Sequence, residues 1–181
     1  MLDATDGDLV LATRQGRAEA YGELVRRYQG AVFGVCYRLA GERREAEDLA
    51  QEAFLRAYQR LDTFDARRPF GPWVRRLAAN VCLNRLPRAP AAAALDDERD
   101  EDEAAGAGSP EAAWESAELS ATLRSALLSL PPHYRAVVEL RHFHDMSYAA
   151  IAAELNLPLS DVKSHLFRAR RLLAQKLKTY A

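Results

Sequence analysis

The sequence predicts an all-α protein built from two small helical domains and a flexible acidic linker. Glycine is sparse, with 9 in 181 residues, and runs of β-branched residues are absent, which argues against strands. Apolar residues recur at helical spacing on both sides of residues 89–110, a segment that is rich in Ala, then acidic, then rich in Ala and Gly. A segment of that composition cannot bury a core. We therefore expect domains over residues 5–88 and 111–178, joined by a linker over 89–110.

The first domain should begin with two helices. Residues 6–15 predict a short helix, with Asp6 as the candidate N-cap and Gly16 at its end. A longer helix is expected over residues 18–40, and Gly41 should close it.

A third helix, over residues 43–61, has one apolar face and one polar face. The apolar face carries Ala46, Leu49, Ala50, Ala53, Phe54 and Ala57. The polar face carries Asp48, Gln51, Glu52 and Gln59, with Leu55 among them. A Leu surrounded by polar groups is common in contact surfaces, although single exposed apolar residues are also ordinary. The polar face is therefore a candidate protein-binding surface.

Aromatic and basic residues alternate in the loop and helix that follow. The loop over residues 62–69 contains Phe64, Arg67 and Arg68. A helix should begin near Pro72, with Trp73, Leu77 and Val81 facing inward and with Arg75, Arg76 and Ala79 facing outward. Aromatic rings stack on unpaired bases and arginines meet phosphates, which suits single-stranded nucleic acid. Trp73 is better explained as core, whereas Phe64, in a loop, is less easily explained that way.

The second domain should end in two helices joined by a sharp turn. A helix over residues 111–129 and one that starts at Pro131-Pro132 come before them. Ser147 can cap the first helix of the pair, and Asn156-Leu157-Pro158 interrupts it. Ser160 is the candidate cap of the second, with Asp161 in its first turn.

The last helix has one apolar stripe and one strongly basic face. The stripe contains Val162, Leu166, Ala169 and Leu173. The opposite face and its flanks contain Lys163, Ser164, Phe167, Arg168, Arg170 and Arg171. This arrangement behind a sharp turn is typical of the recognition helix of a DNA-binding helix-turn-helix. A solvated basic surface helix is the alternative, and the preceding helix and turn favour DNA binding.

The sequence disfavours catalysis and metal binding. The two cysteines, Cys36 and Cys82, are too few for a usual zinc site and are expected to be reduced thiols. His142, His144 and Asp145 are interpreted as surface residues beside the turn. A convincing nucleophile–base pair and a phosphate-binding glycine loop are both missing from the sequence, so we expect neither an enzyme nor a bound metal or cofactor.

Charge and hydropathy bear on partners and location. The formal net charge is −1, which is unusual for a DNA-binding protein, but the charges are segregated along the chain. The N-terminus lacks the pattern of a signal peptide, and apolar runs stay well below membrane-spanning length. We expect a cytoplasmic protein without membrane insertion.

Two motifs together resemble the extracytoplasmic function (ECF) class of bacterial RNA polymerase sigma factors. They are AEDLAQEAF over residues 46–54 and VKSHLFRAR over residues 162–170. The second alone is weaker, because other helix-turn-helix regulators share it. The resemblance also includes Phe70-x-x-Trp73 and Ser147-Tyr148-x-x-Ile151, and it covers nearly the whole chain except the linker. It implies a factor that binds core RNA polymerase and directs promoter-specific transcription initiation by recognising −10 and −35 elements and helping to melt DNA.

The resemblance also implies a role for each surface. Residues 5–88 would form sigma region 2 and bind the beta and beta-prime subunits of core polymerase through Asp48, Gln51, Glu52 and Leu55. The same region would read and melt the −10 element through Phe64, Arg67, Arg68, Arg76 and Asn80. Residues 111–178 would form region 4 and read the −35 element of promoter DNA through Ser160, Lys163, Ser164, Phe167, Arg168 and Arg171. The linker would thread the polymerase near its active centre, and an anti-sigma factor is a usual partner.

Several positions depart from the pattern of this class, which often has other residues at Asn84, Pro87, Ser160-Asp161 and His165. Asn84 and Pro87 predict weaker upstream contacts by basic residues. Asp161 predicts that a narrower set of −35 sequences is preferred. A stand-alone regulator is the main alternative, but it would need a symmetric dimer, and the sequence offers no obvious dimerisation helix. An enzyme with a DNA-binding tail is the third hypothesis.

Overall fold

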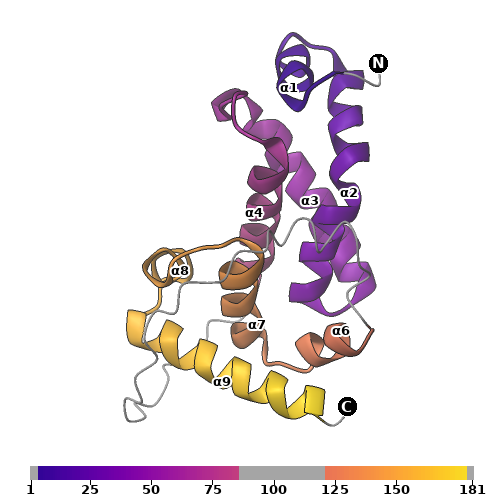
Figure 1. Ribbon diagram of the computed structural model, residues 1–181. Coiled ribbons are helices and arrows are strands. Elements are labelled where there is room, and N and C mark those ends of the chain that lie inside the picture. The colour runs from indigo at the N-terminus through magenta and orange to yellow at the C-terminus, as the bar shows by residue number, and fades with distance from the viewer. Residues whose placement is uncertain (1–3, 86–120, 179–181) are drawn as a thin grey trace. The chain divides into compact units, whose positions relative to one another are not determined.

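The computed structural model describes residues 4–85 and 121–178, and the chain divides into two compact units, residues 1–86 and 87–181 (Figure 1). The described residues are helical and contain no strand, so the predicted all-α class is confirmed. The predicted linker and the first part of the next predicted helix, residues 111–120, lie outside the described residues. Among the helices of these two ranges, none combines the length and the apolar character that a membrane span requires.

The first unit is a helical bundle whose helices agree closely with the predicted ones. Its elements are α1 (Asp6–Arg14), α2 (Ala18–Ala40), α3 (Arg43–Gln59), the 3-10 turn η1 (Leu61–Thr63) and α4 (Phe70–Leu83). Gly41 closes α2 in the left-handed conformation, with a φ of 83°. The helix α3 ends before the predicted position because Leu61 enters η1 and is buried there.

The N-cap of α1 is Thr5 and not Asp6, so that prediction is wrong. The Thr5 hydroxyl accepts the Asp8 backbone N–H at 3.2 Å, and the Asp8 carboxylate accepts the Thr5 N–H at 3.0 Å. This reciprocal pair is a capping box. The carboxylate of Asp6 instead accepts hydrogen bonds from Tyr28 and Arg27 of α2.

The core of the first unit lies among α2, α3 and α4, which pack against one another. The predicted apolar face of α3 is confirmed, since all of its members are buried: Ala46, Leu49, Ala50, Ala53, Phe54 and Ala57. The prediction that Ala79 faces outward is wrong, because this residue is fully buried. Because α4 packs against both α2 and α3, more than one side of this helix is covered. Cys36 and Cys82 are both buried, and neither forms a disulfide among the described residues.

The described part of the second unit ends in the predicted pair of helices. Its elements are α6 (Ala121–Leu128), α7 (Pro132–Val138), the π-helical turn η2 (Glu139–Phe143), α8 (Tyr148–Leu155) and α9 (Leu159–Lys178). Ser147 caps α8 by accepting the Ala150 N–H at 3.2 Å, as predicted. Asn156 ends α8 in the left-handed conformation, with a φ of 52°.

The predicted cap of the last helix is wrong. The helix α9 begins at Leu159, so Ser160 lies within its first turn and its hydroxyl contacts Asp161 at 3.4 Å. Proline at position 158 stops α8 from continuing and at the same time favours a helix start immediately after it. The predicted apolar stripe faces inward, with Val162, Leu166 and Ala169 buried.

Candidate protein and nucleic-acid interfaces

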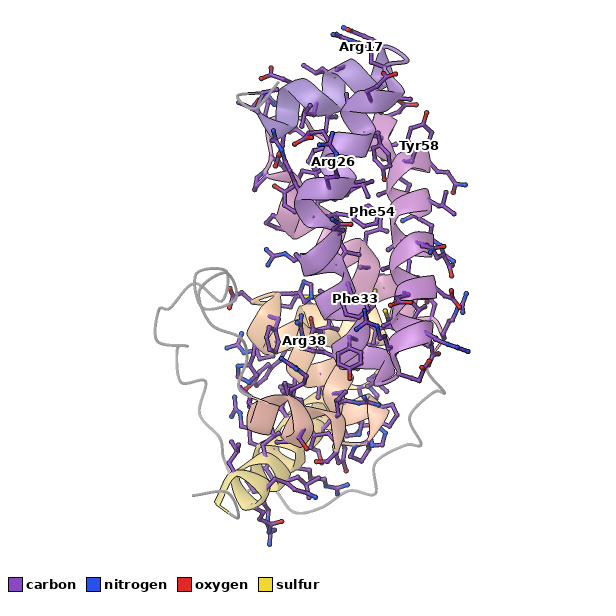
Figure 2. The ribbon with its side chains drawn as sticks, turned by 90° about the vertical axis from the view of Figure 1, so that its right-hand side faces the viewer. Arg17, Arg26, Phe33, Arg38, Phe54 and Tyr58 are labelled. Carbon is purple, nitrogen blue, oxygen red and sulfur yellow. The ribbon has the colours of Figure 1, made fainter. Side chains whose placement is uncertain are left out.

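The outward face of α3 presents two large side chains to solvent. Leu55 is 65% exposed and Tyr58 is 52% exposed. Tyr58 follows Leu55 by three positions and therefore lies on the same side of the helix. Sequence reasoning missed Tyr58, although its spacing from Leu55 was a usable signal. Its ring stands edge-on to Tyr21 of α2, with centroids 5.0 Å apart, and Figure 2 shows Tyr58 on α3 one turn from Phe54.

Three polar residues complete this surface, which we call the α3 face (Asp48, Gln51, Glu52, Leu55 and Tyr58). Asp48 and Gln51 are exposed. The Glu52 carboxylate is engaged within the unit, because Arg56 and Arg85 donate to it at 2.6 and 2.7 Å. The structure thus brings the predicted residues together on one face, but it leaves Glu52 less free than the sequence indicated.

The loop between α3 and α4 carries two exposed arginines around one aspartate. The side chains of Arg67 and Arg68 are 90% and 80% exposed. The Asp65 carboxylate accepts the Arg67 backbone N–H at 3.1 Å and its guanidinium at 2.9 and 3.0 Å. These bonds from Arg67 lower the pKa of Asp65 to about 2, so the carboxylate stays charged at neutral pH. The loop therefore has a defined shape and an exposed basic tip.

Phe64 is part of the core, contrary to the expectation from its place in a loop. It is 6% exposed, and its ring lies 4.6 Å from that of Trp73 and 5.7 Å from that of Phe70. The start of α4 at Phe70 brings these rings together beneath the loop. Phe64 thus anchors the loop and does not present its ring to solvent.

Arg76 and Asn80 lie one turn apart on α4. Arg76 is exposed and Asn80 is half-buried. The Asn80 side-chain oxygen is buried and has no hydrogen-bond partner among the described residues. A buried acceptor without a partner is costly, so Asn80 would gain free energy if its side chain turned outward to accept a hydrogen bond from a bound group.

The outer face of α9 combines basic and apolar side chains. Lys163 and Arg171 are exposed, Ser164 is half-buried, and Phe167 is 48% exposed. Leu159 is 44% exposed, and it precedes Lys163 by four positions, as Lys163 precedes Phe167. Sequence reasoning missed Leu159 because it placed the helix start at Ser160.

Arg168 of α9 contacts the neighbouring helix α7. It is half-buried, and its guanidinium lies 3.5 Å from the Tyr134 hydroxyl of α7. Tyr134 also lies beside His165, with ring centroids 5.3 Å apart.

His165 lies on the inner side of α9 and not on its basic face. It is 1% exposed, and its ring is 5.1 Å from that of His133 of α7. Burial lowers the pKa of His165, and the nearby His133 and Arg168 lower it further, against the opposing effect of Asp161. His165 is therefore a neutral packing residue at neutral pH.

The expectation that His144 is a surface residue is wrong. Its side chain is 6% exposed and contacts the Glu139 carboxylate, itself 3% exposed, at 3.2 Å. His142 is exposed, as expected. Within residues 4–85 and 121–178, no cluster of His, Cys, Asp and Glu has the arrangement of a metal site.

Comparison with known proteins gives matches over both units. Residues 24–90 match the family Sigma-70 region 2, and residues 120–173 match the family Sigma-70, region 4. The chain is 35% identical over 173 residues to the ECF RNA polymerase sigma factor SigW of Bacillus subtilis (strain 168), covering 91% of this chain and 92% of that protein. It is 34% identical over 182 residues to the ECF RNA polymerase sigma-E factor of Escherichia coli (strain K12), covering 96% and 95%.

Two solved structures are also similar. One is CnrH in complex with the cytosolic domain of CnrY, with a TM-score of 0.56, 26% identity and coverage of 97% of this chain and 99% of that chain. The other is the sigma factor RpoE in complex with the anti-sigma factor NepR from Bartonella quintana, with a TM-score of 0.54 and coverage of 87% and 96%. At 18% identity, the second likeness shows the fold alone.

Proposed function

The chain belongs to the extracytoplasmic function sigma factors of RNA polymerase, and we propose that its two helical units divide the reading of a promoter between them. Sigma factors of this family bind core RNA polymerase and direct promoter-specific transcription initiation. The observation that carries the proposal is the outer face of α9, where cations and an exposed ring follow a capped helix and a sharp turn. We assign residues 5–88 to polymerase binding and the −10 element, and residues 111–178 to the −35 element.

The α3 face is the proposed polymerase-binding surface. An exposed Leu and Tyr set among polar side chains have the composition of an interface centre with a polar rim. Leu55 is the proposed anchor, and Asp48 and Gln51 are the proposed rim contacts to the beta-prime and beta subunits. Glu52 contributes its carboxylate while it remains bridged to Arg56 and Arg85.

The −10 element is the proposed ligand of the α3–α4 loop and of Arg76 and Asn80 on α4. Arg67 and Arg68 offer exposed cations to the phosphates of a melted strand. The unpartnered Asn80 oxygen, once its side chain turns outward, can accept from the amine of a flipped base, with Arg76 one turn away for a phosphate. Phe64 supports this site from within the core and is not assigned a stacking role.

The −35 element is the proposed ligand of α9 in the major groove. Lys163, Arg168 and Arg171 are assigned to phosphates or guanine edges. Ser160 and Ser164 are assigned to polar edges, and Phe167 to a thymine methyl group. The buried position of His165 supports a packing role there and leaves DNA contact to its neighbours.

Partners and location complete the proposal. We assign the protein to the cytoplasm, with no catalytic activity of its own, since the polymerase performs the chemistry. CnrH was solved with the cytosolic domain of another protein, which supports an anti-sigma partner for this chain. The acidic residues 89–110 are the proposed tether between the units.

Gel filtration with and without core RNA polymerase tests the proposal. Co-elution, followed by transcription from a promoter that core polymerase alone does not use, is the expected result. A chain that elutes apart from core polymerase and binds duplex DNA as a symmetric dimer would replace this function with that of a stand-alone regulator.

A further inference from the structure

The guanidinium of Arg14, in the last turn of α1, holds the loop that joins α3 to α4. It donates to the Leu61 carbonyl oxygen from Nε at 3.1 Å and from Nη2 at 2.6 Å, and it also donates to the Phe64 carbonyl oxygen. These two carbonyls lie at the start and at the end of the tight turn that opens the loop. One side chain therefore fixes both ends of that turn.

The other end of α1 touches the loop through a glycine. A Cβ atom added at Gly7 would lie 2.7 Å from the Ala66 carbonyl oxygen. Such a distance is too short for any side chain, so the loop can rest on α1 only because residue 7 is glycine. Ala66 is next to Arg67, so this contact fixes the position of the exposed basic tip relative to α1.

A third contact ties α1 to the start of α4. Asp6 accepts a hydrogen bond from the Tyr28 hydroxyl, and the Tyr28 ring lies 5.4 Å from that of Phe70. A Cβ atom added at Gly71 would lie 2.7 Å from the edge of the same tyrosine ring. Figure 1 shows α1 and the α3–α4 connection at the same end of the first unit.

From these contacts we infer that α1 is a positioning element for −10 recognition and that Arg14 is its main positioning residue. The inference rests on the proposed function of the α3–α4 loop. It adds a role for α1, which precedes the part of the chain that matches Sigma-70 region 2. Arg14 and Gly7 touch the loop backbone, so the side chains of Arg67 and Arg68 stay exposed at its tip.

The physical reason is preorganisation. A loop that must be ordered at the moment of binding loses affinity and discrimination, whereas a loop held in its bound shape does not. Asp65 shapes the tip of the loop locally and Phe64 anchors the loop on α4, while Arg14 and Gly7 of α1 hold its backbone in place relative to that helix. Releasing the loop should therefore weaken base discrimination at the −10 element more than it weakens any other function.

The test uses holoenzyme reconstituted from core RNA polymerase and the full chain. A promoter is first selected with wild-type holoenzyme from a DNA pool randomised over the −35 and −10 regions. Every single-base substitution of that promoter is then transcribed, and the RNA is counted by sequencing. The readout at each element is the RNA count from the selected promoter divided by the RNA count from promoters with one substituted base.

Arg14→Ala and Gly7→Ala are the two test variants, since one releases the loop and the other displaces it. We expect both to lower the −10 ratios by roughly tenfold, the size of an ordinary mismatch penalty, while the −35 ratios and polymerase co-elution stay unchanged. The −10 ratios of Arg14→Lys should lie between those of the two test variants and wild type, because an ammonium lacks the planar fork of the guanidinium.

Each test variant has a matched control on the same unit. Arg17→Ala removes an arginine whose guanidinium donates to the nearby Gln15 side chain at 2.6 Å, and Figure 2 shows Arg17 at the end of the unit. Gly22→Ala adds a methyl group that would meet no described atom within 4 Å apart from the adjoining backbone of its own helix. Both controls should keep the wild-type ratios at both elements.

The outcomes separate the inference from the function on which it rests. Unchanged −10 ratios in both test variants would overturn the positioning role of α1. An equal loss at −10 and −35 would also overturn it, because that is the result of general destabilisation. Undiminished transcription from the selected promoter in Arg67→Ala and Arg68→Ala, whose cations are assigned to phosphates, would instead overturn the proposed function of the loop, and the inference with it.

Discussion

Replacing Leu55 with aspartate gives the most direct test of the α3 face. Full burial of a Leu side chain contributes about 1.5–3 kcal/mol. Leu55 is 65% exposed in the free chain. Covering that exposed part would therefore contribute about 1–2 kcal/mol to binding, so Leu55→Ala should raise the Kd for core polymerase roughly 5- to 30-fold.

The aspartate substitution should cost considerably more. An unpaired carboxylate in a closed interface loses its hydration, which costs several kcal/mol per ion. Leu55→Asp should therefore raise the Kd by roughly 100-fold or more. The fold should survive, since a substitution at an exposed helix position changes the free energy of unfolding by less than about 1 kcal/mol.

The assay is titration of labelled chain with core RNA polymerase, with circular dichroism and thermal unfolding measured on each variant. Leu11→Asp is the matched control, because Leu11 is also an exposed Leu, 49% accessible, on another helix of the same unit. It should bind like wild type. Wild-type affinity in Leu55→Asp, or equal losses in the two aspartate variants, would refute the assignment of the α3 face.

Three further predictions concern the second unit. Arg168→Ala should lower promoter-specific transcription while polymerase co-elution is retained. Tyr134→Phe, which removes only the hydroxyl 3.5 Å from Arg168, should have little effect on either measurement. If Arg168→Ala lost transcription and co-elution together, that result would contradict separate roles for the two units. If Phe167 meets a thymine methyl group, replacing that thymine by uracil should weaken transcription by wild type but not by Phe167→Ala, and independent, additive losses would argue against the contact. Burial lowers the pKa of His133 and of His165 below 6.5. At neutral pH both histidines are neutral in the folded chain, and they bind protons more readily in the unfolded chain. The free energy of unfolding should therefore be highest above pH 6.5 and fall as the pH drops through that value towards the lowered pKa, by up to about 1.4 kcal/mol per pH unit and group. Denaturant titrations at several pH values measure this slope, His165→Gln should reduce it, and a slope unchanged by that substitution would exclude His165 as a source.

The sequence alone determined the helices, their faces and the family resemblance. A helix buries side chains at a fixed spacing, so the inward face of α3 and the exposure of Leu55 between polar neighbours could be read from local order. The same holds for α9, where Val162 and Leu166 are buried and Phe167 is exposed. The end of α8 at Asn156 also follows from neighbouring residues, because the left-handed cap and the proline after it are local constraints.

The tertiary structure decided the features that depend on residues far apart in the sequence. Phe64 has no periodic neighbours, and its burial depends on the rings that α4 brings beneath the loop. Arg14 reaches carbonyls 47 and 50 positions away, and Arg168 meets a hydroxyl 34 positions away. Composition and spacing predict which face of a helix is buried, but they contain no information on which distant backbone passes over it. The packing of the helices decides which backbone passes there, and it also decides the shape of the loop that we assign to the −10 element.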